Sequence, residues 1–172
     1  MRGFFSFLNN SDEWLFLKIN KKFRFNFLDA VMSRLTHLGG AYFTLFICLV
    51  LIFSNFQASR FIALQAMMAL IISQMFVQVL KKKVNRQRPY FTLENIIVTK
   101  PLFDNSFPSG HTAAGFALAS SFAFNFPILG IPLFVLASLI GFSRTYLGFH
   151  YPLDVFTGAF LGTSTAYIVF LI

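Results

Sequence analysis

Long stretches without a charged residue constrain this chain more than any other feature. Residues 61–80 contain no Asp, Glu, Lys or Arg, and residues 105–143 contain none either. An α-helix rises 1.5 Å per residue, so about 20 apolar residues match the roughly 30 Å hydrocarbon core of a bilayer. Hydrophobic residues make up 56% of the 172 residues, and charged residues only 12%. This charge fraction is about half that of soluble domains, so the pattern predicts a membrane protein.

The apolar runs predict an all-α, polytopic membrane helical bundle with about five transmembrane helices and an N-terminal amphipathic interfacial helix. The expected spans are at about residues 39–53, 61–80, 109–126, 128–142 and 153–172. Residues 1–36 are too charged to span, because one cation at mid-bilayer costs about 2.5–3.5 kcal/mol. They are expected to form one or two helices lying in the interface. The predicted division is therefore an interfacial segment, 1–36, and a membrane-embedded core, 37–172.

The charge distribution and the cysteine content limit the kinds of binding partner and cross-link that the chain can have. The net charge is +8, but the basic residues cluster at the ends of apolar runs. Anionic headgroups and an anionic substrate explain this distribution better than nucleic acid does. Cys48 is the only cysteine, so one chain can form neither a disulfide nor a Cys-based metal site. The oligomeric state stays open.

A count of five spans places three polar stretches on one membrane face. Loop 81–108 follows the second span, loop 143–152 follows the fourth, and the N-terminal segment lies on the same side. The stretch DNSFPSGH, residues 104–111, runs from loop 81–108 into the third span. Ser109 is a potential helix cap, Gly110 lets a ligand approach the backbone, and His111 lies in the first helical turn. A helix start of this kind favours anions through its unpaired N–H groups and its dipole.

Three cations lie where spans meet the polar loops: Lys81, Arg88 and Arg144. An Arg fork fits phosphate oxygens and a Lys ammonium provides a compact charge, so we expect these residues to bind phosphate. For Lys81 and the two lysines after it, an ordinary basic anchor at a helix end is an alternative. Arg144 is harder to explain in that way, because it follows a long apolar run and precedes a loop with a His and an Asp.

His111 and His150 each lie at the mouth of a span on this face, whereas His37 has no acidic neighbour and is expected to be structural. Imidazoles with near-neutral pKa can serve as nucleophile and as proton donor. Asp154, four residues after His150, could accept its ring N–H and fix the tautomer. These residues predict phosphoryl transfer in which His150 attacks phosphorus and His111 protonates the leaving oxygen. Ser109 and Gly110 would help the three cations to hold the phosphate.

No cofactor and no metal are expected. A metal site built from Asp104, Asp154 and the two histidines is a weaker alternative, because the chain has no HExxH pair and no carboxylate cluster.

The chain resembles the type-2 phosphatidic acid phosphatase family, also called lipid phosphate phosphatases. Three blocks carry the resemblance: Lys81 to Arg88-Pro89, Pro108-Ser109-Gly110-His111, and Ser143-Arg144 to His150 and Asp154. Every spacing fits, and the likeness covers about residues 35–172. It implies a helical core, a histidine nucleophile, metal independence and a substrate with a lipid phosphomonoester or pyrophosphate head. Undecaprenyl pyrophosphate, phosphatidylglycerol phosphate and phosphatidic acid are the substrates considered.

Two other readings compete with a lipid phosphatase. Vanadate-dependent haloperoxidases have a similar anion pocket, but the five apolar spans argue against a soluble enzyme of that kind. A non-catalytic protein that binds or transports lipid phosphates is the alternative from another class. Transport is disfavoured because the spans carry no charged residue except at their ends.

The membrane face of the site is the point on which two arguments disagree. The resemblance implies an active site on the extracytoplasmic face of the cell membrane. Of the 14 Lys and Arg residues, however, only Arg60 falls on the face opposite to the predicted site. The positive-inside rule therefore favours a cytoplasmic site.

Overall fold

The computed structural model describes residues 2–22, 24–98 and 100–172, with side chains from Asn10 onward. Every regular element within these ranges is helical, which confirms the all-α prediction. The helices are α1 (Arg2–Lys22), α2 (Asn26–Leu38), α3 (Ala41–Ile52), α4 (Gln57–Val84), α5 (Pro89–Thr92), α6 (Gly110–Asn125), the 3₁₀ turn η1 (Pro127–Leu129), α7 (Gly130–Tyr146) and α8 (Pro152–Phe170).

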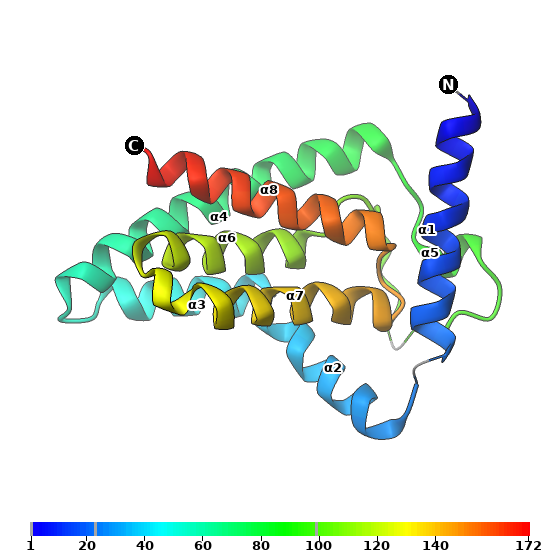
Figure 1. The fold of residues 1–172 in the computed structure, drawn as a ribbon, viewed down its shortest axis with the longest axis horizontal. Coiled ribbons are helices and arrows are strands. Elements are labelled where there is room, and N and C mark those ends of the chain that lie inside the picture. Colours follow the sequence, from blue (N-terminus) through cyan, green and yellow to red (C-terminus); the bar gives the residue numbers. More distant parts are fainter. Residues whose placement is uncertain (1, 23, 99) are drawn as a thin grey trace.

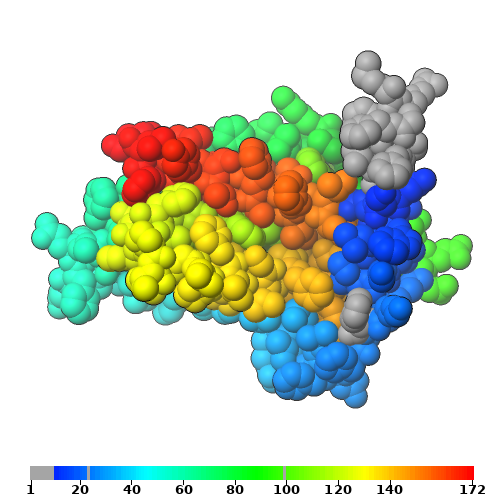
Figure 2. All heavy atoms as spheres, in the orientation of Figure 1, coloured from blue at the N-terminus to red at the C-terminus, as the bar shows by residue number. Residues whose placement is uncertain are grey.

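Helices α3, α4, α6, α7 and α8 run alongside one another as a bundle (Figure 1). Helix α6 packs against α4, α7 and α8 and therefore occupies the centre. Helix α1 lies across one end of the bundle, next to the chain between α4 and α6 (Figure 1). In the space-filling view α1 covers the end formed by the first turns of α8 (Figure 2). The polar loops and the N-terminal helix thus meet at the same end, as the span count required.

Three segments among the described residues are long and apolar enough to cross a membrane: Gln57–Thr92, Pro127–Tyr146 and Pro152–Phe170. Helices α2 and α3 meet at a 54° bend and would make a fourth span if they are counted together. Helix α6 has only 16 residues. A multi-helix membrane bundle is therefore confirmed, whereas the count of five spans and the interfacial role of α1 stay predictions.

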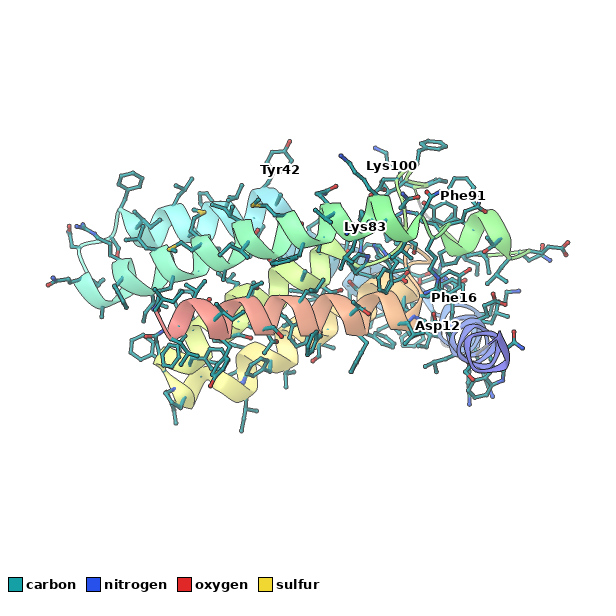
Figure 3. All side chains as sticks on the ribbon, turned by 90° about the horizontal axis from the view of Figure 1, so that it is seen from above. Asp12, Phe16, Tyr42, Lys83, Phe91 and Lys100 are labelled. Atoms are coloured by element: carbon teal, nitrogen blue, oxygen red, sulfur yellow. The ribbon has the colours of Figure 1, made fainter. Side chains whose placement is uncertain are left out.

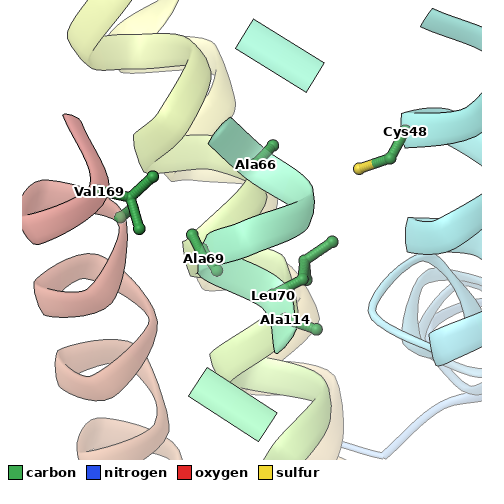
Figure 4. Packing of buried hydrophobic residues seen from close by; sticks show 8 residues of the cluster. Cys48, Ala66, Ala69, Leu70, Ala114 and Val169 are labelled. Carbon is green, nitrogen blue, oxygen red and sulfur yellow. The ribbon is translucent and has the colours of Figure 1, made fainter. Parts of the chain in front are cut away.

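Small residues let the central helices approach closely. Ala66, Ala69 and Leu70 of α4 pack with Ala114 of α6, Cys48 of α3 and Val169 of α8 in one buried cluster (Figure 4). Where lipid replaces water, helices associate mainly through such close packing.

The contact between α6 and α8 is the tightest of these. A Cβ atom added at Gly158 would lie 2.5 Å from the carbonyl oxygen of Ser109, and one at Gly162 would lie 2.8 Å from the nitrogen of Ala117. At the site end of this contact, the Ser109 N–H donates to the Asp154 carbonyl oxygen at 3.0 Å. The glycines of α8 therefore bring its first turn against the start of α6.

We predict that Gly162→Ala lowers the stability of the protein by about 1–3 kcal/mol, the usual cost of overpacking a core. The added methyl group would press on the backbone of α6, which cannot move without disturbing the bundle. Thermal unfolding in detergent measures the effect. Gly130→Ala is the matched control, because its Cβ would meet nothing closer than the Ala123 Cβ at 3.7 Å. Equal melting temperatures for the two variants would contradict the prediction.

Candidate active site

A cavity of about 730 Å³ reaches from the flank of α3 and α4 to the polar loops. Its wall along the helices is apolar and includes Leu45, Leu70, Ile71, Met75 and Val79. Its inner end carries the charged and titratable side chains Lys81, Arg88, Asp104, His111, Arg144 and His150. A molecule with an anionic head and an apolar tail matches this division.

The structure brings most of the predicted site residues to this one cavity. Six of the eight line it: Lys81, Arg88, Gly110, His111, Arg144 and His150. Ser109 and Asp154, both in the described part of the chain, are fully buried and lie outside the lining. Both histidines therefore face the same space, which the phosphoryl-transfer hypothesis required. The roles assigned to these eight residues stay predictions.

His150 is buried between a carboxylate and a cation. Its Nδ1 lies 3.6 Å from Asp154 Oδ2, within ion-pair range but too long for a hydrogen bond. Its Nε2 lies 3.4 Å from Arg88 Nη1, at the cavity side. Burial lowers the pKa of His150 to about 3; Asp154 opposes this shift, and Arg144 and Arg88 add to it. The imidazole is therefore neutral at pH 7, the state that a nucleophile needs.

Asp154 is fixed by three donors at the start of α8. The Ser106 hydroxyl donates to Oδ2 at 2.5 Å, and the Tyr151 N–H donates to the same oxygen at 3.0 Å. Arg86 Nη1 donates to Oδ1 at 2.8 Å. The Asp154 carboxylate is fully buried. Its Oδ2 consequently faces Nδ1 of His150 in a defined orientation.

Sequence reasoning missed Arg86, Ser106 and Asp12. Arg86 lies two residues before the Arg-Pro pair, and only the lysines at the start of the basic stretch and that pair were singled out. Helix α4 ends at Val84, and the left-handed conformation of its C-cap residue Asn85 (φ 50°) turns the chain so that Arg86 enters the site. Asp12 was missed because nothing in its local sequence relates it to residues more than 70 positions away. An acidic residue inside a basic amphipathic segment is the one signal that could have drawn attention to it.

The three predicted cations differ in what they contact. Arg88 donates from Nε to the Asp104 carbonyl oxygen at 2.9 Å and from Nη1 to the Phe149 carbonyl oxygen at 2.8 Å. Arg144 donates from Nη1 to Thr36 Oγ1 at 2.6 Å, and its buried Nε has no hydrogen-bond partner among the described residues. A buried donor without a partner is costly. Arg144 also lines the cavity, so its guanidinium adds positive charge there.

Asp104 places an anion at the inner end of the cavity. Its carboxylate pairs with Lys81 Nζ and lies 2.7 Å from Arg88 Nη2. Partial burial opposes ionisation of Asp104, but the hydrogen bond from Lys81 and the charge of Arg88 lower its pKa to about 2. The side chain is still 56% exposed. An internal carboxylate therefore contacts the same two cations that were predicted to bind phosphate.

The start of α6 departs in detail from the expected anion site. Helix α6 begins at Gly110 with Ser109 as its N-cap, but within the described structure the Ser109 side chain makes no capping hydrogen bond. Its hydroxyl accepts a hydrogen bond from Thr112 Oγ1 at 2.9 Å, and its N–H is used by Asp154. The ring of His111 lies near Gly40, whose added Cβ would be 3.7 Å from Nε2. The break between α2 and α3 thus leaves room for the His111 imidazole.

Metal ligands are not grouped in the part of the chain that the structure describes: no three His, Cys, Asp or Glu side chains are arranged to hold an ion there.

Comparison with known proteins assigns a family to this arrangement of a buried imidazole, a carboxylate and cations in a helical membrane bundle. The family model of the PAP2 superfamily matches residues 62–172, more than half of the chain. The chain belongs to the PAP2 superfamily.

Relatives and solved structures agree with this assignment. The chain is 33% identical over 113 residues to the bacitracin transport permease protein BcrC of Bacillus licheniformis and 28% identical over 131 residues to undecaprenyl-diphosphatase BcrC of Bacillus subtilis. These matches cover 65% and 74% of this chain, but only 56% and 66% of the relatives, less than two thirds of their length.

Two crystal structures share the fold. Aquifex aeolicus LpxE matches with a TM-score of 0.84 and 31% identity, covering 92% of this chain and 93% of its own. A transmembrane PAP2-type phosphatidylglycerolphosphate phosphatase from Bacillus subtilis matches with a TM-score of 0.79 and 26% identity, covering 94% and 84%.

We predict that Asp104→Asn tightens the binding of orthovanadate, a phosphate mimic, by about three- to tenfold. Asparagine keeps an oxygen for Arg88 but removes the negative charge that faces Lys81 and Arg88. Isothermal titration in detergent measures the dissociation constant. Asp29→Asn is the control, because Asp29 accepts from the Tyr146 hydroxyl at 2.6 Å and is not among the cavity residues. Weaker binding by Asp104→Asn would show that the carboxylate is needed to position the two cations.

Proposed function

We propose that this protein is an integral membrane phosphatase that hydrolyses the phosphomonoester or pyrophosphate of a lipid through a phosphohistidine intermediate, without a metal. The observation that carries the proposal is the placement of His150. Its Nδ1 faces Asp154, and its Nε2 faces a cavity with cations at one end and apolar walls along the other.

In the first half-reaction His150 Nε2 attacks phosphorus, and the bond between phosphorus and the leaving oxygen breaks. Asp154 opposite Nδ1 keeps the proton on that nitrogen and stabilises the positive charge that the ring gains. His111, which faces the same cavity, gives a proton to the leaving oxygen. In the second half-reaction His111 takes a proton from water, and the water oxygen attacks phosphorus. The bond between phosphorus and His150 Nε2 breaks, which releases phosphate and restores the neutral imidazole.

The cations stabilise the charge of the transferring phosphoryl group. Lys81, Arg88 and Arg144 converge on the cavity from α4, the chain that follows it and α7. The start of α6 at Ser109 and Gly110 adds the positive end of a helix dipole. Catalysis of phosphoryl transfer rests mainly on such positioning and electrostatic stabilisation.

The apolar part of the cavity would hold lipid tails. Its wall on α3 and α4 includes Leu45, Ile71 and Met75, which are also exposed on the flank of the bundle. A tail could therefore lie in lipid while the head reaches His150. Named relatives are an undecaprenyl-diphosphatase and a phosphatidylglycerophosphatase B. We therefore propose undecaprenyl pyrophosphate, phosphatidylglycerol phosphate and phosphatidic acid as the substrate candidates.

The proposed membrane arrangement has five spans, α3, α4, α6, α7 and α8, in a core of residues 37–172. Helix α6 has only 16 residues, about 24 Å. Because α4, α7 and α8 surround it, its ends need not extend to both lipid interfaces. Figure 3 shows helix α1 end-on while these helices run across the view, so α1 lies across the end of the bundle, as an interfacial helix would. Exposed Trp14 in α1 suits the headgroup region.

Replacement of His150 tests the reaction. In detergent with EDTA present, we expect the protein to release phosphate from at least one of the three candidate lipids. His150→Ala should lower that rate by about 10³-fold or more, because the covalent path is lost. A colorimetric assay for released phosphate measures both.

His37→Ala provides the control, since His37 is not among the cavity residues, and it should retain activity. Substantial turnover by His150→Ala would refute its role as nucleophile, and loss of wild-type activity with EDTA would refute the metal-free reaction. Vanadate binding without turnover of any lipid would favour a non-catalytic binding protein.

The basic residues support a cytoplasmic active site. Arg60, in the first turn of α4, is the one Lys or Arg assigned to the far end of the bundle. In a Cys48→Ala background, we expect a membrane-impermeant maleimide to label Asn55→Cys on intact bacterial cells but Lys100→Cys only after the cells are broken. Asn55 and Lys100 are both exposed, at opposite ends of the bundle. The reverse labelling pattern would place the site outside.

A further inference from the structure

We propose that Arg86 is a positioning residue for the catalytic pair and that Asp12 makes the N-terminal helix α1 part of that machinery. Arg86 would act through Asp154, which in turn orients His150. The inference rests on the proposed function, because it concerns the rate at which His150 reacts.

Arg86 bridges two carboxylates from opposite ends of the chain. Its Nη1 donates to Asp154 Oδ1 at 2.8 Å, and its Nη2 donates to Asp12 Oδ2 at 2.7 Å. The guanidinium carbon lies 3.9 Å from the centre of the Tyr151 ring, so the group is also stacked. A planar guanidinium fork can satisfy two carboxylates and an aromatic face at once, which a lysine cannot.

Burial makes this bridge necessary. The side chains of Asp12 and Asp154 are 1% and 0% exposed, and that of Arg86 is 18% exposed. Two buried carboxylates close together repel each other and are costly without a cation between them. The other titratable groups that face this cluster are His150, Tyr151 and Glu13. Arg86 is therefore the cation that keeps Asp12 and Asp154 ionised side by side.

The bridge also fixes the orientation of Asp154. Arg86 occupies Oδ1, while the Ser106 hydroxyl and the Tyr151 N–H occupy Oδ2. A carboxylate held at both oxygens cannot rotate, so Oδ2 stays opposite Nδ1 of His150. Without Arg86, the carboxylate would be held through Oδ2 alone and would be repelled by Asp12. The charge that forms on His150 during attack would then be stabilised less well.

Asp12 extends this arrangement to α1. Its Oδ1 accepts the Leu153 N–H at 2.9 Å, one of the free N–H groups at the start of α8. One turn further along α1, fully buried Phe16 packs on Tyr151 with ring centres 5.4 Å apart. Asp12 and Phe16 both lie where α1 meets the start of α8 (Figure 3). Helix α1 is thus joined to Tyr151 and Leu153, which directly precede Asp154 in the chain, and does more than cover the bundle end.

The test is a charge-based double-mutant cycle with Arg86→Gln and Asp12→Asn in the full-length protein. The readout is kcat per vanadate-binding site, so that misfolded molecules are not counted. Arg86→Gln should lower kcat by about 10- to 100-fold, the range for groups that orient a catalytic side chain. KM should change by less than about threefold, because the cavity cations are untouched.

Addition of Asp12→Asn to Arg86→Gln should recover kcat by about threefold or more, because it removes the carboxylate that repels Asp154. A merely structural clasp between α1 and the bundle would behave in the opposite way, since a second broken contact would lower activity further. Further loss in the double variant, or wild-type kcat in Arg86→Gln, would overturn the proposal.

Two variants complete the design. Arg24→Gln is the matched control, because Arg24 also holds the N-terminal segment to the bundle, through the Tyr146 carbonyl oxygen at 3.1 Å, and should keep kcat within about twofold. If Arg86→Gln binds no vanadate, the kcat of Arg86→Lys tests the proposal instead. A kcat clearly below wild type would support the requirement for a guanidinium that bridges two carboxylates, and an unchanged kcat would overturn it. Phosphate release by the wild type and its loss in His150→Ala test the proposed function separately, so either idea can fail alone.

Discussion

The burial of charged groups at one end of an apolar bundle governs the rest of this structure. Arg88 and Asp154 are at most 2% exposed, although each carries a full charge in its ordinary state. A buried charge is tolerated only when it is paired and hydrogen-bonded. The pairs here join the end of α4, the chain before α6, the start of α8 and helix α1. Ion pairs, rather than regular secondary structure, thus hold the polar end of the protein together.

Close packing of α8 on α6 fixes the positions of the groups at this charged end. Gly158 and Gly162 leave no space for a side chain between the two backbones. The first turn of α8 therefore meets the start of α6, and the Ser109 N–H donates to the Asp154 carbonyl oxygen. Asp154 and His111 belong to the starts of these two helices, so the same helix contact sets the distance between them. Apolar packing deep in the bundle in this way positions polar groups at its end.

The sequence predicted the parts of the site that depend on span ends and failed where long-range pairing decides. Apolar runs locate helix ends, and an even number of predicted spans separates loop 81–108 from loop 143–152. The sequence therefore predicted that Lys81, Arg88, Arg144 and both histidines meet at one face, and they do line one cavity. The partner of a buried charge cannot be read in the same way. Arg86 and Asp12 are 74 positions apart, and their pairing depends on α1 lying across α8. Local reasoning likewise assigned the Ser109 N–H to a ligand, whereas the α6–α8 contact uses it internally.

The carboxylates of the site divide into one that can be displaced and two that cannot. Asp104 is 56% exposed and contacts the cavity cations Lys81 and Arg88. In the proposed function, an entering phosphate would replace this carboxylate, whose charge would return to water. The carboxylates of Asp12 and Asp154 are buried without access to water, and Arg86 pairs with both. In the proposed reaction, an entering anion would therefore exchange partners only at the cavity side of His150. The carboxylate on the other side of the ring stays in place, as the proposed phosphohistidine intermediate requires.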